Sequence, residues 1–122
     1  MQHFSKLVVW GKAHSLVLEV YLATKAFPQT ERYGLTMQLR RAASSVAANI
    51  AEGRGRIGEG EFGRFLRIAL GSATELEYHL LLARDLSLVD PSQHDKLAGE
   101  LRLVQRMLAS LIRKLRSPQA AS

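Results

Sequence analysis

Apolar residues recur every three or four positions in four segments of this chain, and no segment shows the two-residue alternation of a β-strand. Spacing of this kind places apolar side chains on one face of an α-helix. We therefore predict helices at about residues 7–26, 31–52, 61–87 and 91–116, followed by a frayed tail at 117–122. Long helices joined by short connectors pack as antiparallel neighbours. The predicted fold of the 122 residues is one all-α domain, an up-down-up-down four-helix bundle.

The breaks between the predicted helices contain residues that commonly end or start helices. Phe27-Pro28 should end the first helix, because proline disfavours helix in the residue before it. Gly53 lies where a left-handed residue often terminates a helix, which predicts that the second helix stops there. Asp90-Pro91 is the clearest start, with Asp90 as the N-cap and Pro91 at the first helical position.

The second predicted helix has an apolar face and a face of small residues. Its apolar seam consists of Leu35, Leu39, Ala42, Val46 and Ile50. The opposite side is small and almost uncharged, and we expect it to contact another subunit through Ser44, Ala47, Ala48 and Ala51. Small side chains allow a second helix to approach closely. An exposed, alanine-rich helix chosen for its helix propensity is the alternative.

Three polar residues near this seam are interpreted as structural. Asn49 lies at the edge of the seam, where a buried amide usually makes a hydrogen bond that fixes register or a helix end. Glu52 lies in the last helical turn, where the helix dipole disfavours a carboxylate, so we expect it to have an arginine partner. Glu75 is expected to be paired in the same way.

Positive charge is the main chemical character of the chain. It has 17 Lys and Arg against 11 Asp and Glu, a formal net charge of +6. This balance favours anionic partners such as nucleic acid, although an ordinary basic protein without such a partner is an equally open reading. On the fourth predicted helix, with no acidic residue among them, four arginines fall within about 80° of one another: Arg102, Arg106, Arg113 and Arg116. They form either a phosphate-contacting surface or a solvated face.

A second basic cluster surrounds the turn between the second and third predicted helices. It comprises Arg54, Arg56, Arg64 and Arg67, and Glu52, Glu59 and Glu61 partly offset its charge. The string from Gly53 to Gly58 matches GxGxxG, but the dinucleotide fingerprint requires a preceding strand and this string follows a helix. We therefore interpret it as a connector, with arginine contacts to nucleic-acid phosphates more credible than nucleotide binding.

No catalytic, metal-binding or cofactor-binding residues are predicted. The chain has no cysteine, which excludes disulfides, thiol catalysis and cysteine-bound zinc. No Glu-x-x-His pair of the di-iron bundles occurs, and the four histidines are scattered. The absence of an apolar run of about 18 residues and of an N-terminal signal core predicts a cytoplasmic protein without a membrane partner.

Several strings along most of the chain resemble the four-helix bundle family of ribosomal intervening-sequence proteins, named from reading frames inserted in 23S rRNA genes of some bacteria. They are VWGKAHSLVLEVY (9–21), FPQTERYGLTMQLRRAASSVAANIAEGRGR (27–56), FLRIALGSATELEYHLLLARDL (65–86) and RMLASLIRKL (106–115). The resemblance implies a four-helix bundle that assembles as a ring-shaped homopentamer with no established enzyme activity. The chain also resembles the accessory variability protein of diversity-generating retroelements, which binds nucleic acid through a basic surface and acts with a reverse transcriptase. That likeness implies nucleic-acid contacts at Arg40, Arg41, Arg54 and Arg56.

The leading hypothesis is therefore a non-enzymatic, homo-oligomeric module that binds RNA or DNA through phosphate electrostatics. The alternative hypothesis is a protein-interaction scaffold whose partner is an acidic protein, a reverse transcriptase or another polymerase.

Overall fold

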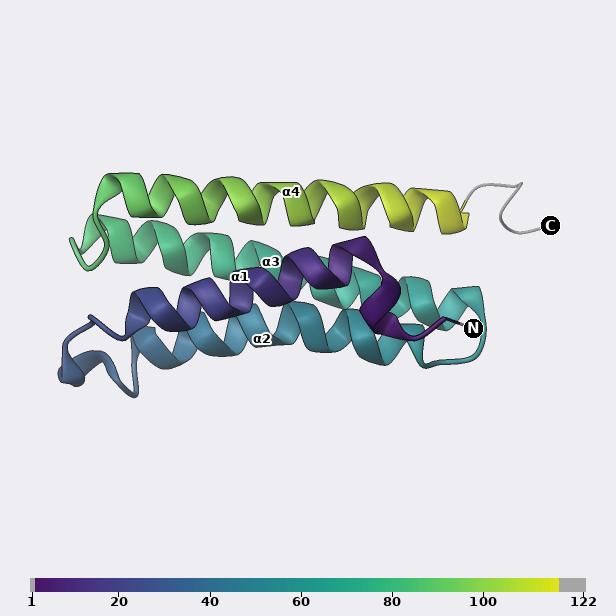
Figure 1. The fold of residues 1–122 in the computed structure, drawn as a ribbon, viewed down its shortest axis with the longest axis horizontal. Coiled ribbons are helices and arrows are strands. Elements are labelled where there is room, and N and C mark those ends of the chain that lie inside the picture. The colour runs from purple at the N-terminus through teal and green to yellow at the C-terminus, as the bar shows by residue number, and fades with distance from the viewer. Residues whose placement is uncertain (1, 117–122) are drawn as a thin grey trace.

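A computed structural model describes residues 2–116 and shows four long helices lying side by side (Figure 1). The helices are α1 (Val8–Thr24), α2 (Leu35–Arg54), α3 (Glu59–Asp85) and α4 (Pro91–Arg116). Two 3-10 turns precede α1 and α2, at Phe4–Lys6 and Gln29–Glu31. The predicted all-α four-helix bundle is confirmed, and the predicted tail at 117–122 lies outside the described residues.

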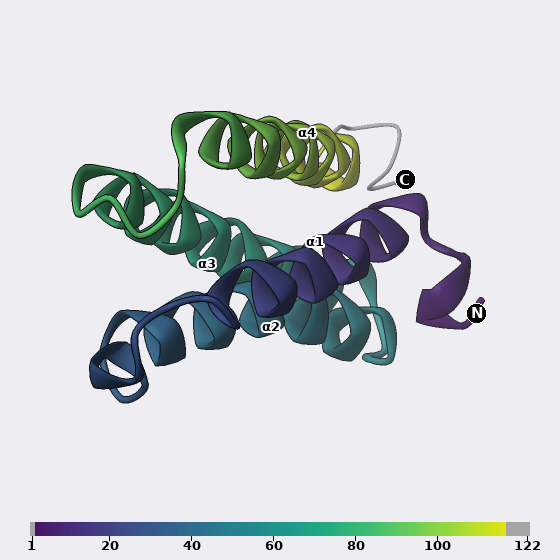
Figure 2. The same cartoon turned by 60° about the vertical axis from the view of Figure 1, so that its left-hand side comes forward.

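The helices form a closed ring of neighbours. Each helix packs against the next one in the chain, α1 also packs against α4, and the diagonal pairs within residues 2–116 make no close backbone contact. The contact between α2 and α3 is the most extensive and that between α1 and α4 is the least extensive, and Figure 2 shows α4 standing away from α2. The bundle is therefore tight on its α2–α3 side and looser on its α1–α4 side.

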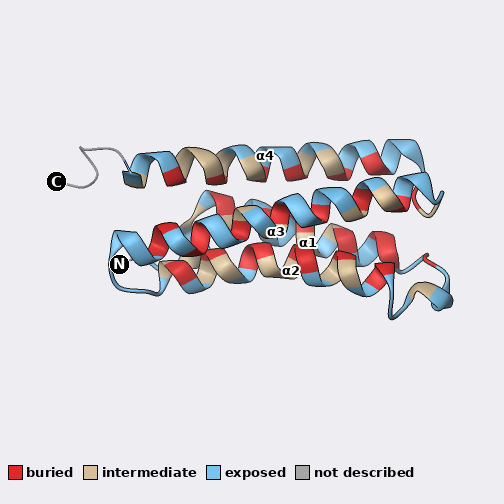
Figure 3. Cartoon of the chain, turned by 180° about the vertical axis from the view of Figure 1, so that it is seen from behind, coloured by how far each residue is buried: buried red, intermediate tan, exposed pale blue. Residues whose placement is uncertain are grey.

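The core follows the predicted apolar seams, and Figure 3 shows buried residues on the faces that the helices turn toward one another. Long apolar side chains fill the centre: Leu16, Leu39, Ile50, Leu66, Leu76, Leu80, Leu101 and Leu108. Burying one such side chain stabilises the fold by about 1.5–3 kcal/mol. Small residues are buried on both helices of the tightest pair, including Ala42 and Ala43 on α2 and Ala69 and Ala73 on α3. Their size explains how α2 and α3 approach so closely.

Gly53 has a different role from the one the sequence predicts. It is buried inside α2, which continues to Arg54, and a Cβ atom at Gly53 would lie 2.6 Å from Cβ of Phe65 on α3. The left-handed glycine of this turn is instead Gly58, with φ of 96°, immediately before α3. The prediction of a helix terminator at Gly53 was wrong, because the glycine is required by a neighbouring helix that local sequence does not reveal.

Side-chain hydrogen bonds cap the N-termini of α2 and α4. Helix α2 begins at Leu35, four residues later than predicted, and the Leu35 amide donates to the Glu31 carboxylate at 3.2 Å. Asp90 caps α4, since its Oδ1 accepts hydrogen bonds from the Gln93 amide and the Ser92 hydroxyl, both at 2.8 Å. The Gln93 bond, followed by that of Ser92, holds the pKa of the Asp90 carboxyl below its ordinary value. Helix α4 then spans the same residues, 91–116, that the sequence predicts.

Candidate nucleic-acid interface

The four arginines of α4, here called the α4 stripe (Arg102, Arg106, Arg113 and Arg116), are all exposed on the outer side of the bundle. Within residues 2–116, no hydrogen bond or ion pair joins any of the four to another residue. From first to last they extend about 21 Å along the helix, at 1.5 Å per residue. The guanidinium groups of the stripe are thus free to contact an external anion, and several phosphates of one chain lie within their reach.

Packing on the opposite side of α4 sets the orientation of the stripe. The buried residues there are His94, Leu97, Leu101, Val104, Leu108 and Ile112. The predicted seam ended with Leu111 and Leu115, which are only half-buried, while Ile112 takes the core position. The Gln105 amide also donates to the Glu77 carboxylate of α3 at 3.0 Å. These contacts limit rotation of α4 about its axis and keep the stripe directed outward.

The arginines of the α2–α3 turn are held by groups of their own chain. Arg56 Nη2 lies 2.7 Å from Glu52 Oε2, so Glu52 has an arginine beside it, and Arg64 Nε lies 3.1 Å from Glu61 Oε2. Hydrogen bonding and charge from Arg64 lower the pKa of Glu61, and the pKa of Arg64 is raised in return. Both guanidinium groups also lie over the ring of Phe65, at 5.1 and 4.6 Å from its centroid.

Arg54 is engaged in a similar way. Its Nε donates to the Gln2 carbonyl at 3.2 Å and its guanidinium lies over the Phe62 ring at 5.6 Å. Arg54 therefore contacts parts of the same chain, as Arg56 and Arg64 do, but only Arg56 and Arg64 are paired with a carboxylate. Arg67, the fourth arginine of the sequence cluster, is exposed and lines a hollow between the start of α3 and the end of α4.

Arg40 and Arg41 lie at the other end of the bundle, near the α1–α2 connection. Arg40 Nε donates to Thr24 Oγ1 at 2.8 Å, and its guanidinium lies 4.6 Å from the centroid of the Tyr21 ring. Arg41 donates to Gln38 at 2.7 Å and lies 3.8 Å from a carboxylate oxygen of Glu75. Most of the length of α2 separates these two arginines from the α2–α3 turn. The structure therefore does not bring Arg40 and Arg41 into one site with Arg54 and Arg56.

The two arginines share a pocket with aromatic residues that sequence reasoning missed. A cavity of about 400 Å³ is lined by Tyr21, Arg32, Tyr33, Thr36, Met37, Arg40, Arg41 and Ser44. Tyr21 of α1 is 40% exposed and is not among the buried residues of the core. The sequence signal that could have revealed the pocket is the adjacency of arginine and tyrosine at Arg32-Tyr33, in the connector before α2.

The small-residue face of α2 is narrower than predicted. Ala47 is only 8% exposed and belongs to the bundle's own core, because that core extends further around α2 than the predicted seam. Ala48 is exposed, and Ser44 and Ala51 are half-buried. Asn49 donates to the carbonyl and hydroxyl of Ser45 at 2.8 and 3.0 Å, and that hydroxyl lies 2.8 Å from the Ser72 hydroxyl of α3. Asn49 therefore supports a polar link between α2 and α3.

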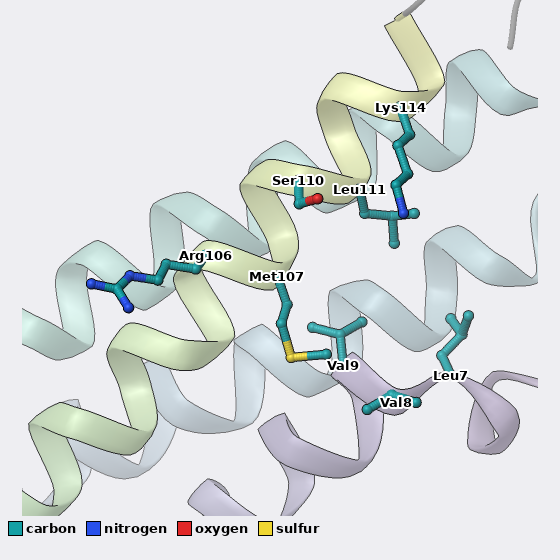
Figure 4. Close-up of a pocket in the computed structure, with 8 residues that line it drawn as sticks. All are labelled: Leu7, Val8, Val9, Arg106, Met107, Ser110, Leu111 and Lys114. Atoms are coloured by element: carbon teal, nitrogen blue, oxygen red, sulfur yellow. The ribbon is translucent and has the colours of Figure 1, made fainter. Parts of the chain in front are cut away.

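An apolar groove runs along the loose α1–α4 side of the bundle (Figure 4). It has a volume of about 370 Å³ and lies between Leu7, Val8 and Val9 at the start of α1 and Arg106, Met107, Ser110, Leu111 and Lys114 of α4. In Figure 4 the Met107 side chain extends toward Val9, while Arg106 points away from the groove. The groove offers apolar contacts beside the basic stripe, without a pair of groups arranged for acid–base chemistry.

Two features of residues 2–116 bear on metal binding and on membrane insertion. No group of three or more His, Asp or Glu side chains in this range is arranged to hold a metal ion. Of the helices described, none has both the length and the apolar character needed to cross a membrane.

Comparison with known proteins places this bundle in a family. A family model described as 23S rRNA-intervening sequence protein matches residues 5–110. The chain belongs to the 23S rRNA-intervening sequence protein family. The match covers the first three helices and most of α4, including Arg102 and Arg106 of the stripe. The predicted resemblance to the ribosomal intervening-sequence proteins is thereby confirmed.

One solved structure shares the fold. It is the 1.70 Å crystal structure of a protein with unknown function, from the S23 ribosomal protein family of Bacteroides thetaiotaomicron VPI-5482. It superposes with a TM-score of 0.78 at 24% sequence identity, over 86% of this chain and 98% of that one. A search of curated proteins found no match. Neither the family description nor that of the solved structure names an enzymatic activity.

Proposed function

We propose that the protein is a non-enzymatic RNA-binding module that contacts RNA phosphates through the α4 stripe. One observation carries the proposal: four exposed arginines lie on one helix face and have no partner within the described residues, in a chain of net charge +6. The family description mentions 23S rRNA, and RNA is therefore the nucleic acid that the proposal names and the experiment tests.

The chemistry of the stripe suits a polyanion. A guanidinium group presents a planar set of N–H donors that matches the oxygens of a phosphate, and it stays charged at every physiological pH. Binding of each phosphate releases condensed counterions, so affinity should fall steeply as salt rises. Contacts of this type position the backbone without reading bases, and we therefore expect little sequence preference from the stripe alone.

The test is a fluorescence anisotropy titration with a labelled RNA hairpin, repeated at several salt concentrations. If four phosphates are contacted, the plot of log affinity against log salt should have a slope of roughly −3 to −4. Absence of binding at low salt, or binding that is indifferent to salt, contradicts the proposal. A stoichiometric acidic protein or polymerase recovered from the native host without nucleic acid would favour the scaffold alternative instead.

We further propose that the chain forms a homo-oligomer, a pentamer by the family resemblance, in which the outer side of α2 is a subunit contact. The outer side of α2 presents the small side chains of Ser44, Ala48 and Ala51. Elsewhere on the surface, α1 exposes the apolar side chains of Leu18 and Leu22, and Leu22 lies on the side of α1 toward α4. An oligomer would cover such residues and repeat the α4 stripe around a symmetry axis, which strengthens binding through multivalency.

Analytical ultracentrifugation at micromolar concentration tests this second proposal. Ala48→Glu introduces a charge on the exposed side of α2 and should convert the oligomer into monomers that keep their helical circular dichroism. Ala48 is the suitable position because Ala47 is buried in the monomer, where a charge would unfold the bundle itself. Thr74→Glu, on the exposed side of α3, is the matched control and should leave assembly unchanged. A monomeric wild-type protein contradicts the proposal.

A further inference from the structure

The pocket near the α1–α2 connection contains an aromatic side chain that contributes little to the fold. Tyr33 is 78% exposed and stands in the short segment between the 3-10 turn Gln29–Glu31 and α2. Its ring contacts the guanidinium of Arg32, whose carbon lies 5.5 Å from the ring centroid. Tyr33 also lines a cavity of about 400 Å³ together with Arg32, Arg40 and Tyr21.

The second aromatic ring of the pocket carries a fixed arginine. Thr24 is buried and its hydroxyl donates to the Val20 carbonyl at 2.8 Å, which locks the oxygen that accepts from Arg40 Nε. The Arg40 guanidinium is thereby held over the Tyr21 ring. Its two terminal nitrogens make no hydrogen bond within residues 2–116, so their donors remain available to an external acceptor.

This combination of rings and cations differs from the α4 stripe, whose exposed arginines have no aromatic residue between them in the sequence. Arginines alone bind phosphates, whereas an exposed aromatic ring beside arginine also stacks on a nucleobase. Bases inside a duplex are already stacked on each other, and only an unpaired base offers its face to a protein ring. The pocket therefore suits a single-stranded segment and not a duplex.

We propose that this pocket binds an unpaired nucleotide of an RNA chain, with its base stacked on Tyr33 and the adjacent phosphates contacted by Arg32 and Arg40. The inference rests on the proposed function, because it assumes an RNA ligand, and adds to it a site that distinguishes unpaired from paired segments. The α4 stripe supplies affinity for any backbone, and the pocket supplies the preference for exposed bases.

The test compares two labelled oligomers of equal length and charge, an oligouridylate and an abasic chain with the same phosphates, on the full-length protein. The wild type should bind the oligouridylate about tenfold more tightly than the abasic chain, in line with one stacked base. Tyr33→Leu should reduce that ratio to about one without changing affinity for the abasic chain. Tyr33→Phe keeps the ring and should retain the preference.

The matched control is Tyr78→Leu, since Tyr78 is also an exposed tyrosine but lies on α3 outside this pocket. It should behave as the wild type with both oligomers. If Tyr33→Leu keeps the full preference for the oligouridylate, the inference is overturned while RNA binding by the stripe stands. If the wild-type protein binds neither oligomer at low salt, the proposed function fails and this inference fails with it.

Discussion

The α2–α3 turn and helix α4 each carry four arginines, but three of those at the turn contact groups of their own chain and those of α4, within the part of the chain that the structure describes, do not. At the turn, Arg56 and Arg64 are paired with carboxylates three or four residues away and share the ring of Phe65. On α4 the stripe arginines have no such partner within residues 2–116. Equal numbers of charges in a sequence thus give unequal capacity to bind an anion. The difference depends on whether acids lie within one helical turn of the arginines, because i,i+3 and i,i+4 neighbours meet on a helix surface.

The largest expected effect comes from removing the stripe. Replacing Arg102, Arg106, Arg113 and Arg116 together by glutamine should lower affinity for an RNA hairpin by on the order of 100-fold at low salt. The magnitude of the salt slope should fall by about three, since four phosphate contacts are lost. Anisotropy titrations measure both quantities, and circular dichroism verifies that the bundle remains folded.

The matched control for the stripe is the triple variant Arg54→Gln, Arg56→Gln and Arg64→Gln, which removes cations that the chain itself engages. It should weaken RNA binding by less than about threefold, because these groups exchange existing partners for phosphate at little net gain. If the two variants lose equal RNA affinity, the turn and the α4 stripe do not differ in RNA binding, and both belong to the RNA surface.

The next largest effect is a loss of stability at Gly53, where α2 packs closely against α3 beside the turn. Gly53→Ala should destabilise the protein by about 1–3 kcal/mol, because the new Cβ would meet a Cβ of the facing helix and the backbone must shift. Gly71→Ala on α3 is the control: nothing lies within 4 Å of its added Cβ, and helix propensity should stabilise the fold by about 1 kcal/mol. Urea unfolding measures both changes. Unchanged stability in Gly53→Ala would show that α2 and α3 pack less tightly there.

Features that depend on local order along the chain were predictable from the sequence. The helical seams follow from apolar spacing, the start of α4 from Asp90-Pro91, and the α4 stripe from arginine spacing on one helix. Two of the errors share a cause, which is that a neighbouring helix determines the environment of the residue. Ala47 is buried because the core reaches further around α2, and Gly53 because α3 touches it.

The pocket at the α1–α2 connection was missed for the same reason. Its parts come from α1, the connector and α2, and only the folded bundle brings Tyr21 beside Arg40. A sequence shows which residues share a helix face, whereas the site emerges where faces of two helices meet.

The smallest effect is a pH dependence at the turn. Arg64 lowers the pKa of Glu61 below its ordinary value in the folded protein, first by a hydrogen bond and then by its charge. The pair therefore contributes stability above the unfolded pKa of Glu61, and that contribution is lost as pH falls through the lowered folded value. Glu61→Gln should remove this part of the acid sensitivity, so its melting temperature should fall less than that of the wild type between pH 7 and pH 3.

Both members of the Glu61–Arg64 pair are exposed, so the difference should be small and should disappear in about 1 M salt. Glu59→Gln removes an exposed carboxylate of the same turn that has no ion pair within residues 2–116, and should retain the wild-type acid sensitivity. If Glu61→Gln matches the wild type at every pH, Arg64 is not held by its neighbour in solution. Arg64 would then be as free as the arginines of α4, and the RNA surface would extend from the stripe to Arg64 at the start of α3.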